Sequence, residues 1–254
     1  MSIPAFAYTC PFDFRPMRAL PSSLLFIFAI LVSCQTQTKA PEVLPSILIV
    51  GDSIILGKLG EYLETELGRR GHEVHRHAMV SSGLSGLHEY NWPEATYDYI
   101  DRYHPDLLIA MFGANDSLAV KNYADDAKFT FFSDSGFRER YARKVRLFLS
   151  LNAPRVKTVY WVGQPNLDHH ELTPKFPVLN EIYAQEVARV PNGVFIPVWD
   201  FTSNAGKYKP VMADATGVVG PLKWDFVHFT PHGGKVLGDH IIEAIYNHRR
   251  SHDR

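Results

Sequence analysis

The chain has 254 residues, of which 46% are hydrophobic and 21% are charged, an ordinary composition for one globular domain with a sizeable core. Its net charge of -1 gives no general electrostatic attraction to nucleic acid, so a nucleic-acid-binding protein is not expected. The sequence contains no internal repeat and no long low-complexity segment. These features favour a single folded domain over a repeat protein.

The first 34 residues predict an export signal. Met17 and Arg18 form a positively charged end, and a short apolar run follows over residues 24–32. This run is too short to span a bilayer comfortably, because a transmembrane helix needs about 20 apolar residues. The sequence Leu-Val-Ser-Cys that ends at Cys34 resembles the cleavage box of bacterial lipoproteins, in which the cysteine is lipidated and becomes the new N-terminus.

We therefore expect a lipoprotein-type signal peptide over residues 1–34, lipidation of Cys34 and a polar tether over residues 35–45. The protein would be exported to the bacterial cell envelope and held at the membrane, in the periplasm, by its lipid anchor. A plain signal peptide and an uncleaved anchor are the alternatives, and Met17 is an alternative start to Met1. Cleavage before Cys34 would remove Cys10, the other of the two cysteines, so no disulfide is expected.

The strongest structural signal is the apolar run over residues 47–50, which predicts a buried strand of a parallel sheet. Gly51 ends this run, and Ser53 precedes a predicted helix over residues 54–70. A serine at such a strand-to-helix turn lies at the carboxyl edge of the sheet, where open α/β folds bind ligands. The free N–H groups of a helix N-terminus also stabilise negative charge. Ser53 is therefore a candidate nucleophile, and a simple helix cap is the alternative.

Strands and helices alternate along the rest of the chain. Further strands are expected over residues 73–80, 106–112, 158–162 and 194–198, and helices over residues 92–104, 138–151, 178–190 and 231–248. This alternation predicts an α/β fold in which helices cover both faces of a parallel sheet. Five strands with right-handed crossovers suggest the flavodoxin-like doubly wound order, in a domain over residues 46–250.

Several loops would meet at the carboxyl edge of that sheet. A small-residue loop over residues 81–86 follows the second strand, and Gly-Ala-Asn-Asp over residues 113–116 follows the third. An insertion over residues 117–137 comes next and is long for a compact domain. Long loops near a site are often lids or binding loops, so the insertion is a candidate for that role.

The candidate catalytic residues match serine chemistry. Ester cleavage by a serine needs a base, a carboxylate that orients the base, and donors for the developing oxyanion. His228 is the candidate base for Ser53, and Asp225, three residues earlier, is the candidate orienting carboxylate. The expected oxyanion donors are the N–H of Ser53, the N–H of Gly83 and the side-chain amide of Asn115. This chemistry needs no cofactor.

The same blocks resemble the SGNH (GDSL-type) hydrolase family. Its motifs occur in order over about residues 46–248: Gly51-Asp52-Ser53, Gly83, Gly113-Ala114-Asn115-Asp116 and Asp225-Phe226-Val227-His228. The resemblance implies the SGNH hydrolase fold, and it assigns the four family letters to Ser53, Gly83, Asn115 and His228. Gly86 is an alternative to Gly83. Ile54 stands where leucine is usual, which leaves the chemistry unchanged.

Three further segments resemble a narrower, exported bacterial subgroup of largely unknown substrate: Asn91-Trp92-Pro93, residues 160–165 and His228-Phe229-Thr230. This subgroup lies near envelope-polysaccharide esterases and O-acyltransferases. The resemblance therefore implies hydrolysis of O-acyl esters, such as acetyl esters, on an acylated small molecule or an envelope glycan. An O-acyltransferase with the same intermediate and a non-catalytic envelope-binding lipoprotein are the alternatives. Neither the acyl length nor the oligomeric state follows from the sequence.

Other histidines and tryptophans are weaker candidates. No metal site is expected at His169 and His170, because adjacent residues rarely bind one ion and no zinc-type spacing is present. His232 lies four residues after His228, so a metal shared by the two is an alternative, but the Asp225 pairing explains His228 better. Trp224, beside Asp225, is a candidate for lining the substrate site, where its ring would stack on a sugar.

Overall fold

The computed structural model describes residues 44–87, 90–121 and 128–252. The expected signal peptide over residues 1–34, the lipidation site Cys34 and the tether up to residue 43 lie outside these ranges. Within them, no helix has the length and apolar character needed to cross a membrane.

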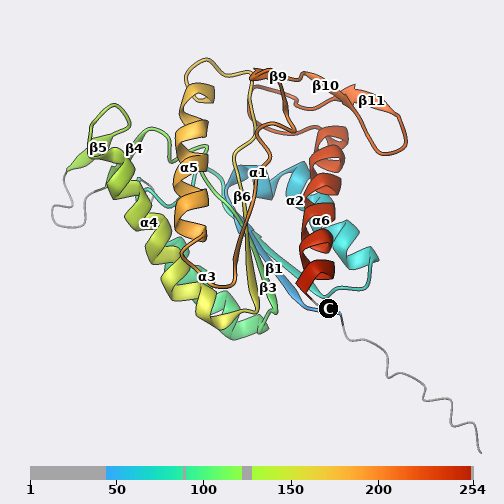
Figure 1. The fold of residues 1–254 in the computed structure, drawn as a ribbon, viewed down its shortest axis with the longest axis horizontal. Helices are drawn as coiled ribbons and strands as arrows, with labels where there is room; N and C mark the ends of the chain where they lie inside the picture. The colour runs from blue at the N-terminus through green and yellow to red at the C-terminus, as the bar shows by residue number, and fades with distance from the viewer. Residues whose placement is uncertain (1–43, 88–89, 122–127, 253–254) are drawn as a thin grey trace, which may run out of the picture. The chain divides into compact units, whose positions relative to one another are not determined.

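A five-stranded parallel sheet forms the centre of the domain (Figure 1). Each pair of neighbouring strands is parallel, and the order across the sheet is β2 (Val74–Ala78), β1 (Ile47–Gly51), β3 (Leu107–Met111), β6 (Thr158–Val162) and β7 (Gly193–Ile196). This is the flavodoxin-like doubly wound order that the alternation of strands and helices predicts. The expected α/β fold is therefore confirmed.

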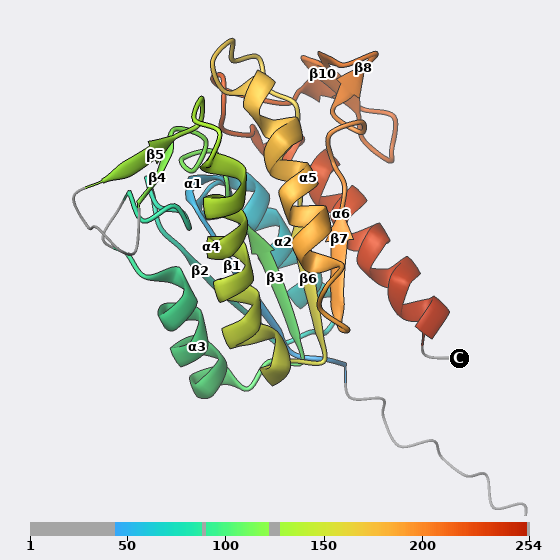
Figure 2. The ribbon, with the colours of Figure 1, turned by 60° about the vertical axis from the view of Figure 1, so that its left-hand side comes forward.

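Helices cover both faces of the sheet (Figures 1 and 2). One face carries α3 (Trp92–Tyr103), α4 (Phe137–Asn152) and α5 (Phe176–Val187), and the other carries α2 (Lys58–Arg69) and α6 (Pro231–His252). The short α1 (Ser53–Leu56) connects β1 to α2. The single helix expected over residues 54–70 is therefore wrong, because the backbone of Gly57 is extended (φ -80°, ψ -157°) and separates α1 from α2.

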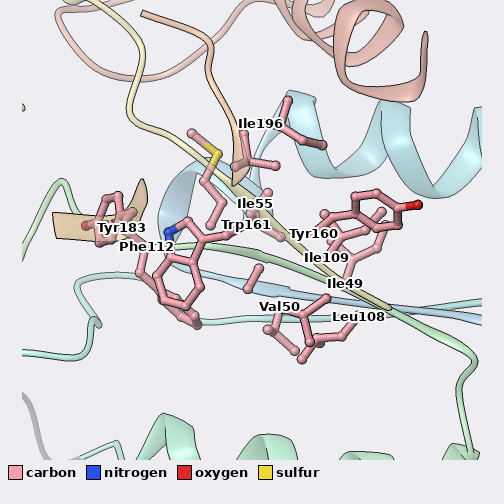
Figure 3. Packing of buried hydrophobic residues seen from close by; sticks show 14 of the residues in the cluster. Ile49, Val50, Ile55, Leu108, Ile109, Phe112, Tyr160, Trp161, Tyr183 and Ile196 are labelled. Carbon is pink, nitrogen blue, oxygen red and sulfur yellow. Dashed lines mark hydrogen bonds between the residues drawn. The ribbon is translucent and has the colours of Figure 1, made fainter. Parts of the chain in front are cut away.

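The core fills the space between the sheet and its helices, as Figure 3 shows. All five residues of β1 and of β3 are buried, because their side chains alternate between two covered faces. Trp161 of β6 is fully buried and packs against the rings of Phe112 and Tyr183. Its role is packing.

Small hairpins stand at the end of the sheet where α1 follows β1 (Figure 2). The expected insertion over residues 117–137 contains one of them, since β4 (Ala119–Lys121) pairs with β5 (Phe129–Phe131); residues 122–127 lie outside the described ranges. Two more hairpins precede α6: β8 (Ser203–Asn204) pairs with β9 (Lys207–Tyr208), and β10 (Val211–Ala213) pairs with β11 (Val219–Pro221). The described residues also contain two 3₁₀ helices, η1 (Ala153–Arg155) and η2 (Thr173–Lys175).

Candidate active site

Ser53, His228 and Asp225 form a continuous hydrogen-bonded relay. Nε2 of His228 lies 3.1 Å from Oγ of Ser53, and Nδ1 of the same ring lies 2.9 Å from Oδ2 of Asp225. Ser53 begins α1 directly after β1, whereas His228 comes 175 residues later, just before α6. A proton on Nδ1, held by the carboxylate, leaves Nε2 to accept the proton of the Ser53 hydroxyl. The structure thus brings together the three residues that the sequence predicts as nucleophile, base and orienting carboxylate.

Asp225 orients the backbone as well as the ring. Its Oδ1 accepts the N–H groups of Val227 and His228, each at 2.7 Å, in a local turn of the kind that aspartate favours. Burial by itself would raise the pKa of Asp225, but these N–H groups and the His228 ring lower it to about 2. The carboxylate is therefore charged at neutral pH and ready to hold the imidazole.

Residues 222–230, which we call the catalytic hairpin, present His228. The Trp224 N–H donates to the His228 carbonyl and the Thr230 N–H donates to the Leu222 carbonyl, each at 3.0 Å. Lys223 and Phe229 form an antiparallel bridge between these two bonds. His228 is therefore carried by a paired segment whose two ends are joined by hydrogen bonds.

Asn115, a predicted oxyanion donor, is tied to the loop that follows β2. Its Nδ2 donates to the Ser82 carbonyl at 2.9 Å. A side-chain amide has two N–H donors, so this bond orients the group and leaves the second donor for a ligand. The neighbouring Ser82 hydroxyl is itself held, since it accepts the indole N–H of Trp92 and donates to the Met79 carbonyl.

Gly83 lies against the carboxylate of Asp116. A Cβ at Gly83 would approach Oδ1 of Asp116 to 2.1 Å, so no side chain fits there. The N–H groups of the next two residues, Leu84 and Ser85, donate to the same carboxylate at 3.0 and 2.9 Å. The alternative, Gly86, faces the side chain of Lys121 in β4. Gly83 is thus the glycine beside the motif that carries Asn115.

Asp116 anchors a buried chain of hydroxyl groups. The Tyr141 hydroxyl donates to Oδ2 of Asp116 at 2.7 Å. The one proton of the Tyr183 hydroxyl is within reach of two acceptors, the Tyr141 oxygen at 2.8 Å and the Phe112 carbonyl at 2.9 Å. Burial raises the pKa of both tyrosines well above its ordinary value, so both remain neutral donors. The sequence does not predict these contacts of Asp116, because it shows only that an acidic residue directly follows Asn115.

Asp52 lies between the turn that carries Ser53 and the loop after β3. Its side chain is fully buried, and Oδ1 accepts the Ile54 N–H at 2.9 Å as the N-cap of α1. Burial raises its pKa to about 7, Asp116 adds to the rise, and the N–H groups of Ile54, Gly113 and Ala114 oppose it. The loop that carries Asn115 therefore lies beside the turn that carries Ser53, because Gly113 and Ala114 are close enough to the Asp52 carboxylate to affect its pKa.

Two exposed aromatic side chains flank Asp225. Trp224 and Phe226 are 64% and 62% exposed, so both are free to contact a bound molecule. The ring of Phe226 lies 6.1 Å from that of His169, edge to face, which brings the His169 segment beside the catalytic hairpin. The assignment of Trp224 to the substrate site stays a prediction.

His232 has a structural partner outside the candidate site. Nε2 of His232 lies 2.9 Å from the Met212 carbonyl. Among the residues that the structure covers, no three His, Cys, Asp or Glu side chains are grouped so as to hold a metal ion.

The chain has the fold of the SGNH hydrolases. It belongs to the family described as "Protein of unknown function (DUF459)", which it matches over residues 46–244. No curated protein matches the chain.

Solved structures of several hydrolases are similar to this fold. LAE5, an α/β hydrolase enzyme from the metagenome of Lake Arreo in Spain, is 16% identical, with 79% of this chain and 94% of that chain covered and a TM-score of 0.55. Axe2, an acetylxylan esterase from Geobacillus stearothermophilus, is 15% identical, with the same coverage and a TM-score of 0.52. The esterase EstA from Pseudoalteromonas sp. is 11% identical, with 80% and 97% covered and a TM-score of 0.53. At these identities the likeness establishes the fold and leaves the substrate open.

Proposed function

We propose that this protein is a serine esterase that hydrolyses O-acyl esters through an acyl-serine intermediate. The observation that carries the proposal is the relay of Ser53, His228 and Asp225, with its contacts of 3.1 and 2.9 Å. His228 takes the Ser53 proton as Oγ attacks the ester carbonyl. The tetrahedral oxyanion is stabilised by the donors of Ser53, Gly83 and Asn115.

The intermediate then collapses and the ester is cleaved in two stages. The C–O bond to the alcohol breaks, and the alcohol leaves with the proton from His228, so that Ser53 carries the acyl group. His228 next takes a proton from water, and the resulting hydroxide attacks the acyl-serine. The carboxylic acid departs and His228 returns the proton to Ser53. Asp225 stabilises the imidazolium in both stages.

The proposed substrate is an O-acyl ester, such as an acetyl ester, on a cell-envelope glycan. The resemblance of three sequence segments to exported envelope proteins supports it, and so does the acetylxylan esterase activity that is named for Axe2. The exposed ring of Trp224 beside Asp225 offers a flat apolar surface for a sugar.

The proposed location is the periplasmic side of a bacterial membrane. The support is the lipoprotein-like sequence over residues 1–34, in which a short apolar run leads to Cys34. The tether over residues 35–45 would join a lipid on Cys34 to the folded domain. An esterase held in this way would meet envelope glycans as its substrates.

Product analysis tests the reaction. Wild type and Ser53→Ala are incubated with an O-acetylated glycan, with and without a deacetylated glycan as acceptor. Release of acetate that depends on Ser53 and ignores the acceptor supports the esterase. Transfer of acetyl groups to the acceptor would instead support an acyltransferase, and binding of the glycan without either product would support a binding protein.

A further inference from the structure

A lysine side chain lies inside the catalytic hairpin. Nζ of Lys223 donates to the Val227 carbonyl at 2.5 Å and lies 3.7 Å from the centroid of the Phe229 ring. A cation over an aromatic face at this distance is attracted by the electron density of the ring. Lys223 therefore joins the two arms of the hairpin directly behind the turn that carries Asp225.

The carbonyl that Lys223 binds belongs to the peptide group that joins Val227 to His228. The N–H of this same peptide donates to Oδ1 of Asp225 at 2.7 Å. Because a peptide group is planar, holding its N–H on one side and its carbonyl on the other restricts the movement of the whole group. Lys223 and Asp225 thus hold the peptide from opposite sides, next to the Cα from which the His228 ring extends.

Packing alone does not explain a lysine at this place. Burial lowers the pKa of Lys223 to about 7, and the charge of Asp225 opposes that fall. An apolar side chain would fill the same space without this loss of hydration. The hydrogen bond to Val227 does not depend on the charge, because a neutral amine also donates N–H groups.

We propose that Lys223 is a positioning residue for the reaction at Ser53: it holds the carbonyl of the Val227–His228 peptide and so keeps the imidazole within reach of the serine hydroxyl. The proposal rests on the proposed esterase function. Lys223 acts through His228 and touches neither the substrate nor the reacting atoms. We call the two hydrogen bonds that hold this peptide, from Lys223 and to Asp225, the clamp. A displacement of the imidazole ring by about 1 Å costs on the order of 100-fold in rate. A change confined to the clamp is therefore measurable.

The test compares Lys223→Met, which keeps the apolar stem, with Lys223→Arg, which keeps donors and charge. Lys207→Met, at an exposed position of β9, is the control. A fluorophosphonate probe is added to the full-length protein, and both the rate constant of labelling at Ser53 and the final labelled fraction are measured. We expect Lys223→Met to slow labelling roughly 10-fold to 100-fold at an unchanged final fraction. Lys223→Arg is expected to recover part of the rate, and Lys207→Met should match wild type.

A role limited to folding would lower the final labelled fraction and leave the rate constant of the folded molecules unchanged. That result, or labelling of Lys223→Met at the wild-type rate, overturns the proposal. If Lys223→Met does not fold, Phe229→Leu takes its place, since it removes the ring contact and keeps the bond to Val227. It should slow labelling by a smaller factor, and a wild-type rate in that variant would contradict the clamp.

Hydrogen exchange separates this proposal from the esterase proposal. The His228 N–H, which is bound to Asp225, should exchange roughly 10-fold faster in Lys223→Met than in wild type, because the peptide is then held on one side only. Absence of labelling in wild type would reject the esterase, whereas the exchange rate tests the clamp without any reaction. Equal exchange of the His228 N–H in both proteins would overturn the clamp.

Discussion

The carboxylate of Asp116 occupies the space into which a side chain at Gly83 would project, with Oδ1 only 2.1 Å from the position of a Cβ. The same carboxylate accepts the N–H groups of Leu84 and Ser85. Two motif blocks that lie about thirty residues apart in the sequence are therefore one structural unit, in which the Asn115 block shapes the Gly83 loop.

Gly83→Ala should damage both stability and activity. The added methyl must displace a buried carboxylate that holds three donors, and overpacking of this kind costs about 1–3 kcal/mol. We expect turnover to fall at least about 10-fold as the loop shifts. Gly68→Ala, at an exposed position of α2 where an added Cβ meets no atom within 4 Å, is the control and should be neutral or slightly stabilising. Urea denaturation and turnover check both variants; equal behaviour of the two would contradict the assignment of Gly83.

Asn115→Ala should lower turnover by about 10²–10³ while the protein stays folded, as the loss of an oxyanion donor does. The variant also loses the bond to the Ser82 carbonyl, which contributes about 1 kcal/mol to the free energy of unfolding. Turnover is measured at a temperature where the circular dichroism spectra of variant and wild type coincide. Near-normal turnover would reject the role of Asn115.

Asp52→Asn should remove one component of the pH dependence of stability. The pKa of Asp52 is raised from 3.8 to about 7 in the folded state, so the folded chain binds this proton more tightly than the unfolded chain. The protonated Asp52 therefore adds its full contribution to the free energy of unfolding below about pH 4, and this contribution is lost as pH rises through about 7. Relative to the variant, wild type should therefore lose up to about 4 kcal/mol between pH 4 and pH 8. Denaturation of both proteins across this range measures the difference, and a difference that does not vary with pH would contradict it.

Cys34→Ala should leave the protein without a lipid anchor. The lipoprotein box needs the cysteine thiol as the site of lipidation, so the variant should lose incorporation of a labelled fatty acid and leave the membrane fraction. Ser33→Ala, which keeps a small residue before the cysteine, is the matched control and should behave as wild type. Continued labelling of Cys34→Ala would disprove the anchor.

The buried parallel strands could be predicted because β1 and β3 are uninterrupted apolar runs. The order of the strands could be predicted because strands and helices alternate along the chain. The ends of the helices and the short strands were harder to predict than the strands of the central sheet. A helix over residues 54–70 follows from local preference, but the extended backbone of Gly57 depends on how α1 and α2 meet. The hairpin β4–β5 was likewise missed, because three-residue strands leave little periodicity in a sequence.

The residues of the candidate site likewise fall into those that the sequence reveals and those that only the folded chain reveals. Ser53, Asp225 and His228 could be found from the residue types that serine chemistry requires and from their motif spacing. Asp116 and Lys223 could not, because their contacts to Ser85 and Val227 exist only in the folded chain. In both cases an ionisable side chain hydrogen-bonds to the backbone of a loop at the candidate site, and its sequence neighbours do not reveal that contact.

The most direct test of the central claim, that His228 activates Ser53 as a nucleophile, is mass spectrometry after reaction with a fluorophosphonate probe. Wild type, Ser53→Ala and His228→Ala are labelled in parallel and the modified residue is identified. The relay predicts one adduct per chain, on Ser53, in wild type and almost none in either variant. Labelling of wild type at another residue, or equal labelling of Ser53 without His228, would contradict it.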